Sequence, residues 1–120
     1  MLPDFHNQHY QKFKQVLLHL QGMEASVPLD APKLRQNFLE AQQFFQQQIL
    51  SLDAGDLEPA DESRVRSYQT EMSKQLRLVE MCVMFLQAAR QPETSINRQQ
   101  ELSRRIQTLV SYCDALLQLN

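Results

Sequence analysis

The chain has 120 residues, of which 42% are hydrophobic, and carries a formal net charge of −2 at pH 7. A chain of this length forms one domain, residues 1–120, and can bury a core without disulfides or a metal. The slight negative charge argues against binding to a nucleic-acid backbone. No window reaches the roughly 18 apolar residues that a membrane span needs. We therefore expect a soluble, cytoplasmic protein that binds neither nucleic acid nor membrane.

The first half of the chain predicts two helices. Apolar residues recur every three or four positions over residues 3–21, at Tyr10, Phe13, Leu17 and Leu20. Gly22 is expected to end this helix in a left-handed conformation. A second helix is expected to begin at Asp30, a good capping residue, with Pro32 in its first turn. The predicted apolar face of the second helix comprises Leu34, Phe38, Ala41, Phe45 and Leu52, with Gln48 in the remaining slot.

The second half predicts a hairpin of two longer helices. After a turn at 53–56, a helix is expected over residues 59–90, with an apolar stripe at Val65, Tyr68, Met72, Leu76, Val79, Val83 and Leu86. Pro92 prevents simple continuation, and a fourth helix is expected to start at Thr94 or Ser95. Its inner face comprises Leu102, Ile106, Leu109, Cys113 and Leu116. With no strand pattern and short connections, we predict an all-α fold: an antiparallel up-and-down four-helix bundle with a long hairpin of helices three and four.

The third predicted helix carries a second apolar stripe in its C-terminal half, at Leu78, Met81, Phe85 and Ala88. At 100° per residue these positions fall opposite the main stripe. Contact with two neighbouring helices and a loop would explain such a widened apolar arc. Alternatively, the stripe binds a second copy of the chain, because Met and Phe are favoured at interfaces and an uncovered apolar patch marks an association site. We predict a homodimer formed through these four residues.

Two groups of charged residues are candidate docking elements for a partner. The acidic group precedes and opens the third predicted helix, at Asp53, Asp56, Glu58, Asp61 and Glu62. The basic group lies on the fourth, at Arg98, Arg104 and Arg105. Either group could instead be ordinary solvated surface, because acidic residues suit a helix start and Glu101 compensates the arginines.

The sequence carries no recognisable catalytic, cofactor or metal motif. His6 and His9 could share a helix face, but zinc sites need three or four ligands and His19 lies far along the same helix. Cys82 and Cys113 fit buried small hydrophobic residues, and the expected hairpin places them too far apart for a disulfide. The two glycines stand alone rather than in a phosphate-binding loop. We therefore expect a non-enzymatic protein without cofactor or metal.

Several segments carry a family resemblance. They are residues 67–78 (SYQTEMSKQLRL), 84–92 (MFLQAARQP), 109–114 (LVSYCD) and 44–49 (FFQQQI), together with an MLP start followed by Tyr10. Together they resemble the PatD family of cyanobacterial heterocyst frequency control proteins, most strongly over residues 67–92. The resemblance implies a small cytoplasmic helical regulator of heterocyst differentiation that binds the tubulin-like division protein FtsZ. It brings no functional residues with it.

Two other functions fit the same residues. A helical adaptor or transcription co-regulator would share this fold without binding FtsZ, and a pull-down from a cyanobacterial lysate would separate it from the FtsZ-binding regulator. A bundle that binds an apolar ligand would use the Met-, Phe- and Cys-containing region of the third helix as a pocket. A small molecule seen in native mass spectrometry would favour that function.

Overall fold

The computed structural model describes residues 2–24, 29–89 and 91–118. Within these ranges the chain is all-α and contains no strand, which confirms the predicted fold class. The elements are α1 (Asp4–Glu24), α2 (Ala31–Phe44), the π-helical turn η1 (Phe45–Ile49), the short 3-10 helix η2 (Ala54–Asp56), α3 (Pro59–Ala88) and α4 (Pro92–Leu117). No helix in the described part of the chain is both long and apolar enough to span a bilayer.

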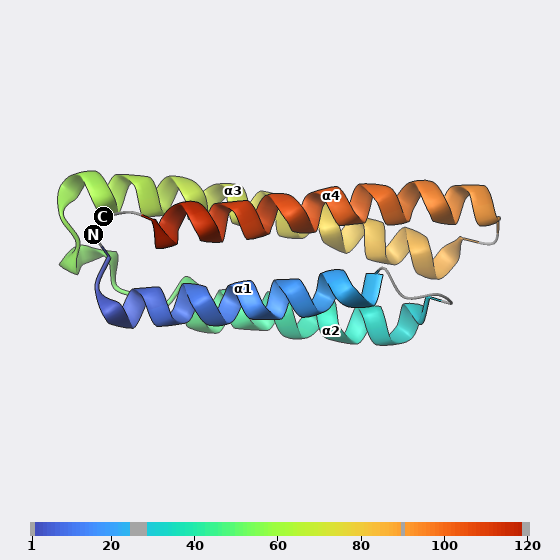
Figure 1. The fold of residues 1–120 in the computed structure, drawn as a ribbon, viewed down its shortest axis with the longest axis horizontal. Helices are drawn as coiled ribbons and strands as arrows, with labels where there is room; N and C mark the ends of the chain where they lie inside the picture. The colour runs from blue at the N-terminus through green and yellow to red at the C-terminus, as the bar shows by residue number, and fades with distance from the viewer. Residues whose placement is uncertain (1, 25–28, 90, 119–120) are drawn as a thin grey trace.

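The four helices run up and down along one long axis and form a rod of 50 × 19 × 18 Å (Figure 1). Each helix packs against two others: α1 against α2 and α4, and α3 against α2 and α4. The most extensive contacts are those of α4 with α3 and with α1. At the turn between α3 and α4, the hairpin extends beyond the ends of α1 and α2 (Figure 1). The predicted bundle with a long hairpin is therefore observed.

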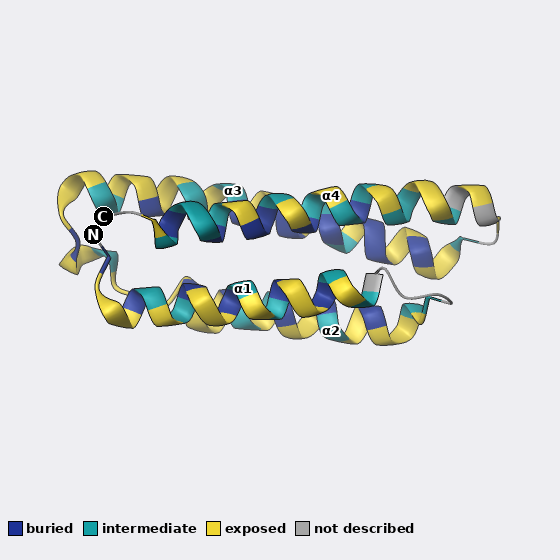
Figure 2. Ribbon diagram, in the orientation of Figure 1, coloured by how far each residue is buried: buried dark blue, intermediate teal, exposed yellow. Residues whose placement is uncertain are grey.

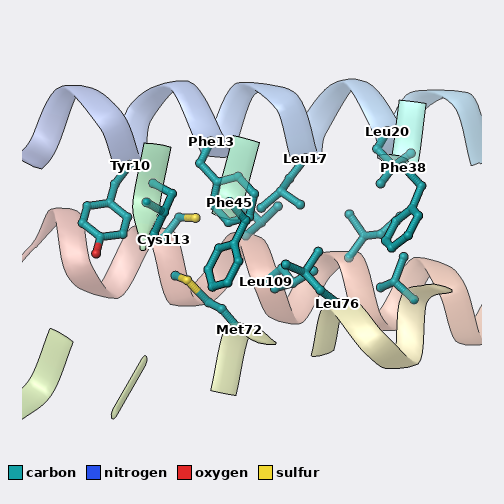
Figure 3. Close-up of a cluster of buried hydrophobic side chains, with 14 of the residues drawn as sticks. Tyr10, Phe13, Leu17, Leu20, Phe38, Phe45, Met72, Leu76, Leu109 and Cys113 are labelled. Carbon is teal, nitrogen blue, oxygen red and sulfur yellow. The ribbon is translucent and has the colours of Figure 1, made fainter. Parts of the chain in front are cut away.

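The predicted apolar faces meet along the axis of the rod, where buried residues line the inner side of every helix (Figure 2). Figure 3 shows part of this core, with Tyr10, Phe13, Leu17, Leu20, Phe38, Phe45, Met72, Leu76, Leu109 and Cys113 labelled. In the predicted stripe on α3, every residue except Tyr68 is buried. The ring of Tyr68 packs against that of Tyr112, with 5.6 Å between the ring centroids. The hydroxyl of buried Tyr10 accepts a hydrogen bond from Gln69 Nε2 at 3.0 Å.

The predicted face of the second helix is wrong at one position, since Gln48 is exposed and Ile49 is buried. The cause is η1, where the backbone N–H of Leu50 donates to the carbonyl of Phe45 at 2.9 Å. This bond spans five residues instead of four, so the turn holds one additional residue. In a regular helix Gln48 and Ile49 both lie within about 60° of Phe45, and in the wider turn Ile49 takes the core position.

The ends of α1 and α2 test two further predictions. Gly22 does not end α1, which continues to Glu24 without a left-handed glycine. A glycine lowers the stability of a helix by about 1 kcal/mol but does not by itself stop it. The predicted cap of α2 is confirmed, because Asp30 Oδ1 accepts a hydrogen bond from the Lys33 backbone N–H at 3.1 Å.

The connection between α3 and α4 lies about two residues earlier than predicted. α3 ends at Ala88, before residue 90, and Ala89 is already extended with φ −67° and ψ 129°. α4 begins at Pro92 rather than at Thr94 or Ser95. Proline is favoured at the first helical position because its missing N–H would have no partner there.

Candidate interaction surface

The second apolar stripe of α3 lies on the outside of the bundle. Met81 is 52% exposed and Phe85 44% exposed, Ala88 is exposed and Leu78 is half-buried. Met84, which the sequence prediction omitted, is 59% exposed. Coverage by neighbouring helices therefore does not explain the exposed members of this stripe. We call these five residues the hairpin face; self-association through it stays a prediction.

Arg98 of α4 joins this surface from the other arm of the hairpin. Its guanidinium lies 4.1 Å from the centroid of the Phe85 ring, a cation–π contact worth about 0.5–1 kcal/mol at an exposed site. Arg98 Nη1 also donates to Glu101 Oε2 at 3.2 Å, and Arg105 Nη2 lies 3.9 Å from Glu101 Oε1. Two of the three predicted basic docking residues therefore share one acidic partner, while Arg104 is exposed beside them.

Two further cations border the hairpin face on α3 and were missed by the sequence analysis. Lys74 and Arg77 are both exposed, and neither makes an ion pair with any residue that the structure describes. Lys74 precedes Leu78 by four residues and Arg77 precedes Met81 by four, so each lies on the same side of the helix as its apolar neighbour. The helical period, applied to charged as well as apolar residues, would have found them.

The acidic group lies at the opposite end of the rod from the turn between α3 and α4 (Figure 1). Asp53 caps η2 by accepting from the Gly55 N–H at 2.9 Å, and Glu62 accepts from Arg66 Nη2 at 2.9 Å. Asp56 and Glu58 are exposed, and Asp61 is half-buried. The two predicted docking groups therefore cannot form one site, because the rod separates them.

His6 is buried among the elements at this acidic end. It is 4% exposed, and its Nδ1 has no hydrogen-bond partner among the residues that the structure describes. Burial lowers the pKa of His6 from its ordinary value, and Asp56, His9 and Asp53 make smaller contributions of opposing sign. The described residues contain no group of three or more His, Cys, Asp or Glu that could hold a metal.

The two thiols lie in the core. Cys82 and Cys113 are both buried and not joined by a disulfide. Burial raises the pKa of Cys82, with a smaller contribution from Glu101. Burial, followed by Asp114, raises the pKa of Cys113 to about 12. Both thiols are therefore protonated at neutral pH, the form that is a poor nucleophile.

A hollow of about 180 Å³ lies between α2–η1 and α3, lined by Gln42, Phe45, Gln46, Leu50, Ser73, Leu76 and Arg77. It is smaller than the 300–1,000 Å³ that is usual for small-molecule pockets, and open hollows of about 310–390 Å³ lie elsewhere on the surface. It also lies apart from the Met- and Phe-containing region, where the ligand-binding alternative placed its pocket.

Comparison with known proteins gives no match. No family model fits the chain, and no curated protein or solved structure is significantly similar to it. Function therefore has to be argued from the surface itself.

Proposed function

We propose that this chain is a non-enzymatic interaction protein that binds another protein through the hairpin face. The observation that carries the proposal is the exposure of Met81, Met84 and Phe85 on one side of α3, while the opposite side of the same helix completes the core. Contiguous apolar residues on the surface of a small protein mark an interaction site more often than chance exposure does.

The composition of the hairpin face supports this proposal. Binding energy at protein interfaces concentrates in aromatic and arginine residues, and here the Phe85 ring stacks against Arg98. Methionine side chains adapt to the shape of a partner because they are unbranched and polarisable. The face lies on α3, which packs closely against α4 along the hairpin, so a partner meets a rigid surface.

For the partner we propose FtsZ, as the resemblance to the PatD family implies. The segment of strongest resemblance, residues 67–92, contains all five residues of the hairpin face. On this proposal the chain regulates the frequency of heterocyst differentiation through the division protein. The predicted homodimer would occupy the same hairpin face, so it is an alternative to the contact with FtsZ and is tested by itself.

Co-sedimentation with FtsZ polymer tests the proposal. We expect the wild-type chain in the pellet and Met81→Glu in the supernatant, because a carboxylate in the centre of the hairpin face opposes its burial. Phe5→Glu is the matched control, since Phe5 is 61% exposed on α1 and lies outside the face. A wild-type chain that stays in the supernatant contradicts the proposal, as does equal loss of binding by both variants.

The predicted dimer is tested separately, by size-exclusion chromatography with light scattering. A homodimer has twice the 14.1 kDa chain mass, and Phe85→Glu should return it to the mass of one chain. A wild-type protein that elutes as a monomer at micromolar concentration contradicts the dimer but leaves binding to another protein open.

A further inference from the structure

Positively charged side chains of α3 and α4 border the hairpin face: Lys74, Arg77 and Arg98. Residues 74–105 contain six basic and three acidic residues, a surplus of three positive charges, whereas the rest of the chain has a surplus of five negative charges. We propose that the hairpin face binds an acidic amphipathic helix of a partner protein. This inference rests on the proposed function and adds the chemistry of the bound segment.

The spacing along α3 fits a helical ligand. From Lys74 to Ala88 the polar and apolar members recur every three or four residues, so they form one continuous strip. The strip is about 21 Å long at 1.5 Å per residue, the length of a helix of about 14 residues. A ligand helix with apolar residues at positions i, i+3, i+4 and i+7 can place them along Leu78, Met81 and Phe85.

The charged residues beside the hairpin face indicate that the bound segment is negatively charged. Among the described residues, the side chains of Lys74 and Arg77 make no ion pair, so both can pair with carboxylates of a bound helix. A second copy of the chain has the wrong charge for this face, because a two-fold dimer would bring the same positively charged patch of both copies together. Like charges brought face to face at an interface cost free energy, whereas an acidic helix neutralises the surplus of positive charge.

The contact between Arg98 and Phe85 favours a protein ligand over a lipid surface. A membrane-bound helix inserts its aromatic residues among the acyl chains, but the Phe85 ring carries a guanidinium at 4.1 Å, and Arg98 is also hydrogen-bonded to Glu101. Insertion of Phe85 would either bury that charge or break both contacts. At a protein interface, stacked arginine and aromatic side chains remain in place as anchors.

Two fluorescent peptides of about 14 residues test the inference by anisotropy. Both have leucine at i, i+3, i+4 and i+7 and alanine at half of the other positions; the remaining positions are glutamate in one and lysine in the other. We expect the glutamate peptide to bind about tenfold more tightly, and added salt to weaken it. Arg77→Glu should reduce this preference, whereas Phe5→Glu should leave it unchanged. Far-UV circular dichroism verifies that both variants fold.

Three results overturn the inference: equal affinity for both peptides, no effect of Arg77→Glu, or binding to phosphatidylserine vesicles with no preference between the peptides. A dimer that Arg77→Glu strengthens, with no peptide binding, identifies a second copy as the ligand and also overturns it. If the wild-type chain still co-sediments with FtsZ polymer and Met81→Glu does not, the proposed function stands and only this inference fails. If that co-sedimentation is also absent, both fail.

Discussion

Replacement of Phe13 by alanine should destabilise the bundle far more than the same replacement of Phe5 on the same helix. Phe13 is fully buried, and its ring lies 6.0 Å from that of Phe44 and 5.6 Å from that of Phe45. Removing a buried phenylalanine costs about 3–5 kcal/mol through lost burial and the cavity left behind. Phe5 is 61% exposed, so Phe5→Ala should change the free energy of unfolding by less than about 1 kcal/mol.

The two variants form a matched pair, because the gain in helix propensity from phenylalanine to alanine is common to both. The chain has no tryptophan, so urea unfolding is followed by far-UV circular dichroism at a single pH. The expected loss for Phe13→Ala corresponds to a fall in Tm of about 10–20 °C for a chain of this size. Equal losses for the two variants, or a loss below about 1 kcal/mol at Phe13, would refute the assignment of Phe13 to the core.

Three further predictions concern features that the structure adds. Ile49→Ala should cost about 2–5 kcal/mol and Gln48→Ala almost nothing, as measured by urea unfolding; the reverse order would contradict the π-helical turn. Asp30→Ala should lower stability by about 1 kcal/mol through loss of the α2 cap, which a shift in the thermal midpoint would detect. Because burial lowers the pKa of His6, the unfolded chain binds its proton more readily, and stability should fall as the pH drops below 6.5, by at most about 1.4 kcal/mol per pH unit. His6→Phe should remove that part of the pH dependence, and identical unfolding curves against pH for the two proteins would exclude a role for His6.

The sequence was sufficient to predict the helices because the apolar spacing is regular and Asp30 is a strong capping residue. It was insufficient wherever one residue changes the local geometry. At η1 the choice between Gln48 and Ile49 depends on a single additional residue in a turn, which has no separate signal in the apolar period. Gly22 does not end α1 because a glycine lowers helix stability only slightly, and Met23 directly after it packs against the core.

The candidate surface was predictable in composition but not in exposure. The apolar period identified Leu78, Met81 and Phe85, but a second apolar face on a helix can equally contact a neighbour within the same chain. Exposure depends on the positions of α2 and α4 around α3, which only the three-dimensional structure gives. The contact between Phe85 and Arg98 joins two helices across the hairpin, so no local sequence pattern could indicate it.

The arrangement of α3 places the core and the proposed binding surface on opposite sides of one helix. Its core residues, such as Val79, Val83 and Leu86, point inward, while Met81 and Met84 lie between them in sequence and point outward. Side chains on opposite sides of a helix share few partners, so their effects on stability should be nearly additive. A substitution at Met81 can therefore remove binding without removing the fold. The surface can also change its partner without any change in the core, because the two sets of residues use different sides of the same helix.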